Sequence, residues 1–266
     1  MRNLSFEKSI TRLENKPLFG KKVLITRAQE QSFSLASKLT QLGAKSICCP
    51  IVSYELIEKE IYNKSIINNV SSYDWIFFTS QNAVRFFFEI LNKNSYDSRA
   101  LARVQIASVG YKTKTELAKY NIRADFIPKR FSFEDLINEL NEKINLKEKK
   151  ILLPKQIETC LSKSLQTIIE WNLYKANFID ALDQEMIIQI KSGIDIVTLF
   201  SSNTASHFAT LIKKHNLEER LNKSLIAVIG KETLKTAKEL FGKVDIIAEP
   251  FTEEGLISSL EKYFTK

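Results

Sequence analysis

Glycine is scarce in this sequence, and its scarcity excludes the common nucleotide-binding loops. Only seven glycines occur among 266 residues, and none belongs to a G-x-G-x-x-G pattern, so a classical NAD site is not expected. The segment GKET at 230–233 resembles the end of a P-loop. Leu225, however, stands where that loop needs its first glycine, and Glu232 where Ser or Thr should follow the lysine. ATP hydrolysis is therefore not predicted.

Cysteine and histidine are also rare. Cys48 and Cys49 are adjacent and Cys160 is alone, which gives no disulfide framework and fits a reducing cytoplasm. His207 and His215 have no Cys or Glu companion at ligand spacing, so no zinc site is expected. We expect two surface histidines, one on a helix and one in the loop after it. With no nucleophile elbow in the chain, we predict no metal, no cofactor and no covalent catalysis.

Long apolar runs and a secretion signal are missing as well. No stretch of about 18 uncharged apolar residues occurs, so no transmembrane helix is expected. Residues 1–20 are a basic lead-in without the apolar core of a signal peptide. These observations predict a cytoplasmic protein that does not bind membranes.

The balance of charge is basic, with a net charge of +8 that admits an anionic partner. Lysines are spread along the whole chain, and there is no basic–aromatic ladder of the kind that stacks bases. Nucleic acid is therefore the weakest of the candidate partners. The length and an apolar content of 44% are enough for two domains, each with a core of its own.

Two stretches of similar design lie about 120 residues apart. DWIFFTSQNAVRFFFEIL occupies 74–91 and DIVTLFSSNTASHFATLI occupies 195–212. Each places an apolar run, typical of a buried strand, before an amphipathic helix, with hydroxyl residues where a helix N-cap belongs. At an offset of 122, the apolar helix positions that coincide are Ala83, Phe86, Phe87 and Ile90 with Ala205, Phe208, Ala209 and Ile212.

Further pairs follow in the same order along the chain. Segment 104–120 matches 224–240 at an offset of 120, 127–140 matches 248–260, and 22–39 matches 150–165 more weakly. The residues that coincide are Gly110 with Gly230, Thr113 with Thr233, Ser132 with Thr252, and Arg27 with Lys155. Strands that alternate with helices predict an α/β protein with parallel sheets covered by helices on both faces.

The hydroxyl and glycine residues all fall where strands end, which is where α/β sheets bind ligands. A helix N-terminus with a hydroxyl can bind an anion through backbone N–H groups and the helix dipole. For any one of these residues, a simple structural cap is the better interpretation. Because the set recurs in both halves on the same edge, the sequence favours a binding site.

These segments together resemble the uroporphyrinogen-III synthase family. The matching pieces are VLITRAQEQ, LTQLGAKSICCPIVSYE, DWIFFTSQNAV, ASVGYKT, FIPKRFSFEDLINEL, LFSSNTA, AVIGKETLKTA and EPFTEEGLISSL, which together span residues 22–260. Each piece is loose alone, whereas their order and spacing are specific.

The resemblance implies two similar flavodoxin- or Rossmann-like lobes joined by a two-stranded linker. Lobe one is expected at 1–52 plus 183–266 and lobe two at 53–182, with the active site in the cleft between them. The implied enzyme is a hydro-lyase of haem and other porphyrin biosynthesis. It cyclises hydroxymethylbilane, a linear tetrapyrrole with eight carboxylates, to uroporphyrinogen III with inversion of the last ring. It uses no cofactor and receives its substrate by a transient hand-off from the preceding bilane-forming enzyme; we expect a monomer.

The resemblance also assigns substrate-binding residues. They are Arg27, Thr79, Ser80, Asn82, Gly110, Thr113, Ser132, Ser201, Ser202, Gly230, Thr233 and Thr252. The family has a tyrosine near the second crossing, about nine residues after a glycine, that is thought to assist loss of the hydroxyl. Counted from Asn172, that position is Ala181, with Tyr174 out of register. The family's Arg-Gly is replaced by Pro154-Lys155, so the proton donor stays unassigned.

Two other interpretations remain open at this point. A non-catalytic two-lobed protein that binds a small polyanion would explain the repeat, the basic charge and the missing tyrosine. A nucleic-acid-binding protein is weaker, because clustered Lys and Arg would be expected. Turnover of hydroxymethylbilane distinguishes the first of these from the enzyme.

Overall fold

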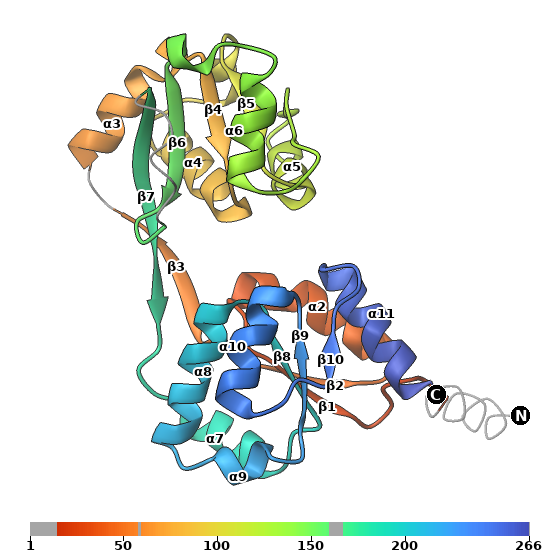
Figure 1. Ribbon diagram of the computed structural model, residues 1–266. Helices are drawn as coiled ribbons and strands as arrows, with labels where there is room; N and C mark the ends of the chain where they lie inside the picture. Colours follow the sequence, from red (N-terminus) through yellow and green to blue (C-terminus); the bar gives the residue numbers. More distant parts are fainter. Residues whose placement is uncertain (1–14, 58–59, 160–166, 266) are drawn as a thin grey trace, which may run out of the picture. The chain divides into compact units, whose positions relative to one another are not determined.

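The chain forms two compact α/β units in a computed structural model that describes residues 15–57, 60–159 and 167–265 (Figure 1). Unit 1 contains the described residues up to Ser53 and those from Asn177 onward, and unit 2 contains those from Tyr54 to Ala176. Unit 1 is therefore discontinuous in sequence, and unit 2 is inserted into it.

The sheet of unit 1 has five strands in the order β10-β9-β8-β1-β2, and every neighbouring pair is parallel. Its strands are β1 (Lys22–Ile25), β2 (Lys45–Cys48), β8 (Ile196–Leu199), β9 (Leu225–Val228) and β10 (Ile246–Ile247). Because all of them point the same way, their last residues lie along one border of the sheet, which we call the carboxyl edge. The opposite border is the amino edge.

Helices cover both faces of this sheet. One face packs against α2 (Gln29–Gln41) and α11 (Glu253–Phe264) through Val23 and Ile25 of β1. On the other face, Leu24 of β1 packs in a second core with four further helices. These helices are α7 (Gln184–Lys191), α8 (Ser202–Lys214), α9 (Glu218–Leu221) and α10 (Lys231–Phe241). Since successive strand residues point to opposite faces, a sheet buried on both sides reads as the continuous apolar runs seen in the sequence.

The sheet of unit 2 has the order β3-β7-β6-β4-β5. Its strands are β3 (Val52–Leu56), β4 (Trp75–Phe78), β5 (Gln105–Ser108), β6 (Ile151–Gln156) and β7 (Ile168–Phe178). Strands β7, β6, β4 and β5 are parallel. Strand β3 runs antiparallel to β7, because Ile57 N–H donates to Leu173 O while Ile179 N–H donates to Ile51 O. The prediction of a purely parallel second sheet is thus corrected to a mixed one.

Helices also cover both faces of the second sheet. Ile76 and Phe78 of β4 pack with α3 (Glu60–Asn68), α4 (Gln81–Lys93) and α5 (Tyr111–Ala118), and Trp75 and Phe77 pack with α6 (Phe133–Asn141). The described residues of this unit also form the 3-10 helices η1 (Val70–Ser72), η2 (Ser98–Leu101) and η3 (Leu146–Glu148). The predicted α/β class, with helix-covered sheets and a two-stranded connection formed by β3 and β7, is confirmed.

The internal repeat is real, but its first pair is shifted by one residue. Helix α4 is capped by Ser80 and α8 by Ser201, an offset of 121 rather than 122. In this register the buried Val84 and Phe87 coincide with the buried Ala205 and Phe208. The sequence allowed both alignments because three consecutive phenylalanines, 86–88, present an apolar residue to the core in either one.

Aspartates at the amino edges repeat as well. In each unit two aspartates accept a hydrogen bond from a backbone N–H in the first residues of a strand or directly before it. Asp74 accepts from Lys150, Asp125 from Ile106, Asp195 from Lys22, and Asp245 from Ile226. Negative side chains thus occupy the edge opposite the helix N-termini.

Within the described part of the chain, no helix is long and apolar enough to cross a bilayer.

Candidate functional site

The predicted residues of unit 1 lie along the carboxyl edge of its sheet. Ser201 caps α8 and accepts from Thr204 N–H at 3.2 Å. Thr252 caps α11 and accepts from Gly255 N–H at 3.0 Å. Gly230 is the N-cap of α10 and offers no side chain. Three helix N-termini therefore follow three successive strands of the sheet, β8, β9 and β10.

Arg27 follows β1 on the same edge and is already paired. Its Nη1 lies 2.8 Å from Glu253 Oε2, and its Nε donates to Gln31 at 2.7 Å. The guanidinium also lies over the ring of Phe200, 4.8 Å from the centroid. Glu253 is shared with Lys38, which raises the pKa of that lysine through hydrogen bonds to Glu253 and Glu254. Arg27 thus fastens α11 to the end of β1, and any role toward a ligand must compete with Glu253.

Unit 2 repeats the arrangement at its own carboxyl edge. Ser80 caps α4 and accepts from Ala83 N–H at 3.0 Å, and Ser132 caps α6 and accepts from Asp135 N–H at the same distance. Gly110 is the bare N-cap of α5. Thr79 precedes the α4 cap and Asn82 lies in the first turn of α4, both half-buried.

The hydroxyls at these caps are engaged in local hydrogen bonds, which is what the structural interpretation predicted for each of them singly. Ser201 is part of a capping box with Thr204, and Ser132 donates to the Asp135 carboxylate. What each helix still offers an anion is the backbone N–H groups of its first turn and the positive end of its dipole.

The two glycine caps leave their helix ends open. A Cβ added at Gly230 would meet no atom within 4 Å, and one at Gly110 would meet Phe131 at an ordinary 3.8 Å. Both have extended backbones, which any residue adopts, so neither packing nor conformation requires glycine there. Thr113 and Thr233, three residues further on, are both buried, and Ser202 is half-buried.

Tyr174, which the sequence placed out of register with the family's tyrosine, contacts one of the predicted residues. It lies on β7, and its hydroxyl is 2.9 Å from the Ser80 hydroxyl at the start of α4. Its ring stacks on Phe86 with centroids 5.1 Å apart, and only 4% of the residue is exposed. Burial raises the pKa of the Tyr174 phenol to about 12, an increase that the hydrogen bond between Tyr174 and Ser80 partly opposes. The group is therefore a protonated hydroxyl at neutral pH.

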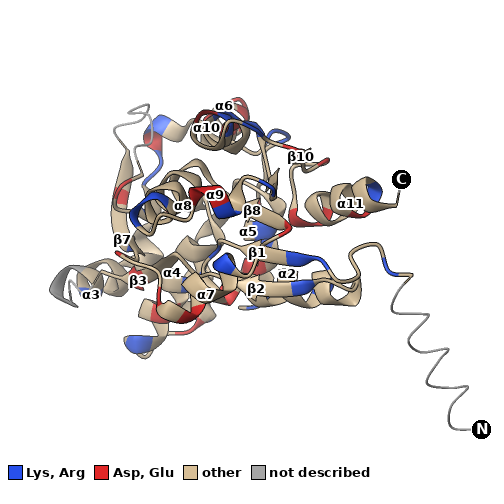
Figure 2. Ribbon diagram, turned by 90° about the horizontal axis from the view of Figure 1, so that it is seen from below, with Lys and Arg blue, Asp and Glu red and all other residues tan. Residues whose placement is uncertain are grey.

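Lys155, the counterpart of Arg27 in the weaker repeat, is also buried and partnered. Its Nζ donates to Thr159 O at 2.6 Å and lies 3.1 Å from Glu170 Oε2. Lys and Arg residues occur on many elements of the ribbon, interspersed with Asp and Glu (Figure 2). The even spread expected from the sequence agrees with this view.

The histidines are structural rather than merely superficial. His207 is half-buried with its Nε2 2.6 Å from Ile179 O, and His215 accepts from Leu182 N–H at 3.0 Å. Both tie α8 to the segment that follows β7. Among the described residues, no group of three or more His, Cys, Asp or Glu is arranged to hold a metal ion.

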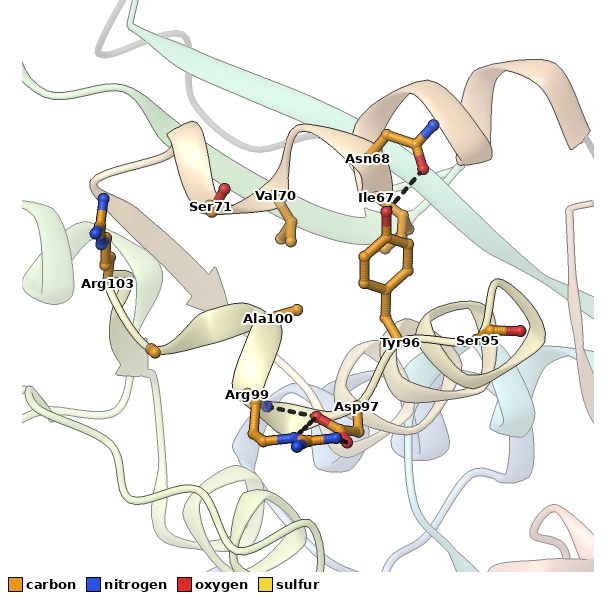
Figure 3. A pocket seen from close by; sticks show the side chains of 11 residues that line it. Ile67, Asn68, Val70, Ser71, Ser95, Tyr96, Asp97, Arg99, Ala100 and Arg103 are labelled. Atoms are coloured by element: carbon orange, nitrogen blue, oxygen red, sulfur yellow. Dashed lines mark hydrogen bonds and ion pairs between the residues drawn. The ribbon is translucent and has the colours of Figure 1, made fainter.

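A cavity of about 410 Å³ lies elsewhere in unit 2 (Figure 3). It is lined by residues that precede β4 and β5, including Tyr96, which donates to Asn68 at 3.3 Å, and Arg99, which is paired with Asp97. This is the amino edge, so the cavity contains none of the predicted residues. The cavity and the repeated residues therefore lie at opposite edges of the sheet.

Comparison with known proteins decides the family. Residues 34–258 match the family described as uroporphyrinogen-III synthase HemD. The chain belongs to the uroporphyrinogen-III synthase family. It is thus a member of a lyase family of tetrapyrrole biosynthesis, as the sequence predicted.

Individual relatives agree with this membership. A porphyrin biosynthesis protein HemD of Ruminiclostridium josui is 31% identical over 92% of this chain, although the chain spans only 49% of that protein's length. The uroporphyrinogen-III synthase of Synechococcus elongatus is 26% identical over 94% of this chain and 98% of its own. A crystal structure of a mutant uroporphyrinogen III synthase from the extremely thermophilic bacterium Thermus thermophilus is similar in fold. Its TM-score is 0.58 at 13% identity, over 92% of this chain and 99% of that one.

The two candidates for the tyrosine position of a uroporphyrinogen-III synthase lie in different units. Ala181, reached by counting in sequence, is exposed in unit 1 beyond the end of β7. Tyr174 lies in unit 2 against Ser80, one of the predicted residues. No spacing rule could reveal this contact, because 94 residues separate the two partners.

Proposed function

We propose that the protein converts hydroxymethylbilane to uroporphyrinogen III with inversion of the last pyrrole ring. The terminal C–O bond breaks as the hydroxyl accepts a proton and leaves as water. The exposed methylene carbon then bonds to the last pyrrole at the carbon that already carries the bridge from the preceding ring, and that older bridge bond breaks. The released bridge methylene forms its new bond at the free α-carbon of the last ring, which inverts the ring. This α-carbon releases a proton, so the proton donor is restored and nothing else is consumed.

The observation that supports this proposal is the repeated carboxyl edge. Each sheet presents three capped helices there: α4, α5 and α6 in unit 2, and α8, α10 and α11 in unit 1. A substrate with eight carboxylates needs many anion sites, and first-turn N–H groups supply them without a metal. The predicted residues listed for both units are proposed to bind these carboxylates.

Holding the substrate is also what the reaction demands. Closure without inversion is the easier outcome, so the enzyme must fix one conformation of the last ring, which is catalysis by positioning. Fixed N–H groups on rigid helices suit this task better than long mobile lysines do.

Tyr174 is the proposed proton donor for loss of the hydroxyl. Its phenol is protonated at neutral pH and is fixed by Ser80 and Phe86. Because Tyr174 is buried whereas Ser80 is half-buried, we propose that the proton passes through the Ser80 hydroxyl.

The test is incubation with freshly prepared hydroxymethylbilane, followed by oxidation and chromatographic separation of the type I and type III porphyrins. Excess type III is the expected result. Type I alone, formed at the uncatalysed rate, would leave the alternative of a non-catalytic protein that binds a polyanion.

A cytoplasmic location, a monomeric state and substrate hand-off from a bilane-forming enzyme stay predictions.

A further inference from the structure

Two phenylalanines are exposed at matching places in the two units. Phe131 stands directly before the cap Ser132, and Phe251 directly before the cap Thr252. They are separated by 120 residues, the same offset that relates Gly110 to Gly230. Phe131 is 56% exposed and Phe251 53% exposed, although phenylalanine is ordinarily among the more buried residues.

The surroundings of Phe131 form a small aromatic surface. Tyr111, the first residue of α5, is 63% exposed and meets the Phe131 ring edge to face, with centroids 5.2 Å apart. Gly110 lies close beside the ring, since a Cβ there would come within 3.8 Å of Phe131 Cβ. The ring therefore stands next to the open N-terminus of α5 and at the start of α6.

Phe251 has a related environment in unit 1. The Nζ of Lys231, the first residue of α10, lies 5.8 Å from the centroid of its ring. Lys231 occupies the position that Tyr111 has in unit 2, 120 residues earlier. Each unit therefore combines an exposed phenyl face, a glycine-capped helix and a hydroxyl-capped helix at one place on its carboxyl edge.

Phe131 contacts Tyr111 and Phe251 contacts Lys231, yet more than half of each phenylalanine stays exposed. A single exposed apolar side chain is ordinary. An exposed phenylalanine directly before the corresponding helix cap in both units is not explained in that way. The substrate of the proposed reaction is a chain of aromatic pyrroles with carboxylates around their rims. An aromatic face flanked by N–H donors complements such a ring in both respects.

We propose that Phe131 and Phe251 are positioning residues on which pyrrole rings of the substrate stack, so that the carboxylates of those rings meet the neighbouring helix N-termini. This inference rests on the proposed function and adds the groups that hold the ring planes. The N–H groups fix the rim of a pyrrole, and the phenyl face fixes its tilt, which the inversion of the last ring requires.

The test compares ring-retaining with ring-removing substitutions. Phe131→Tyr and Phe251→Tyr keep the aromatic face, whereas Phe131→Leu and Phe251→Leu keep apolar bulk without it. Each Leu variant is expected to lose about five-fold in kcat/KM for hydroxymethylbilane and to form a larger fraction of type I porphyrin. The Tyr variants are expected to retain both properties of the wild type.

A matched control is Tyr263→Leu, since Tyr263 is 45% exposed on the last turn of α11, the helix that Thr252 caps. It should change neither the rate nor the isomer ratio, and all five variants should keep the wild-type melting temperature. Leu variants as active and as selective as the wild type would overturn the inference alone. A wild-type protein that forms no type III porphyrin would instead contradict the proposed function on which the inference rests.

Discussion

Tyr174 shows how much a single side chain depends on contacts that the sequence does not display. Its neighbours are Ser80, 94 residues earlier, and Phe86 on the same helix as that cap. Arg27 is a similar case, because its partner Glu253 lies 226 residues later. The sequence identified Ser80 and Arg27 as residues of interest from their position after a strand. What each one touches follows only from the order of the strands in the sheet.

Replacing the Tyr174 hydroxyl tests its assignment as proton donor. Tyr174→Phe keeps the ring against Phe86 and removes the hydrogen bond to Ser80. We expect kcat to fall on the order of 100-fold, because general acid catalysis is lost. The free energy of unfolding should fall by only about 1 kcal/mol. Tyr120→Phe, a half-buried ring stacked on Phe88, is the control and should leave kcat unchanged. Equal rates for both variants would exclude Tyr174 from the chemistry.

The raised pKa of Tyr174 also predicts a dependence of stability on pH. Burial favours the neutral phenol, so the pKa is about 12 in the folded protein against about 10 in the unfolded chain. Its contribution is complete below pH 10 and is lost as the pH rises from 10 toward 12. Between pH 9 and pH 11 the wild type should lose about 1 kcal/mol more than Tyr174→Phe. Urea unfolding of both proteins at the two pH values measures this difference, and parallel losses would contradict it.

Strand–cap–helix elements are the level at which the sequence was most informative. Short apolar runs followed by hydroxyl or glycine residues predicted buried strands and helix starts, because a strand covered on both faces and a capped helix each leave a local signature. The mixed character of the second sheet was missed, since β3 alternates in burial and gives no sign of its direction. The register predicted for the first repeat was wrong by one residue, because Phe86, Phe87 and Phe88 of α4 place an apolar residue in the core in either alignment.

Gly230→Ala separates function from folding at a helix start. The added methyl meets nothing within 4 Å and the backbone is extended, so stability should stay unchanged or rise by up to about 1 kcal/mol. If the first turn of α10 binds a substrate carboxylate, kcat/KM should fall several-fold because the methyl crowds the approach.

Gly193→Ala provides the opposite signature. Its φ of +93° is strained for alanine, so the free energy of unfolding should fall by about 1 kcal/mol. It lies between α7 and β8 at the amino edge, and activity should be unaffected. A Gly230→Ala enzyme with full activity would argue against an anion site at α10.

At the scale of the whole molecule, unit 2 can be tested for its ability to fold without unit 1. Both tryptophans, Trp75 and Trp171, are buried in unit 2, so tryptophan fluorescence of the full chain reports on that unit. A fragment of residues 52–178 retains β3 and β7 whole. We expect it to unfold cooperatively in urea, at a midpoint close to that of the fluorescence transition of the full chain. A fragment without a cooperative transition would show that unit 2 depends on the rest of the protein.

The antiparallel pairing of β3 with β7 has a consequence for the history of the gene. The chain leaves unit 1 along one strand and returns along its neighbour, so the points of departure and return are adjacent in space. The repeated segments run along the chain as 22–39, 74–140, 150–165 and 195–260, which is the order of two copies in tandem. Each unit therefore combines the start of one copy with the end of the other, and the paired strands β3 and β7 are where the chain passes between them.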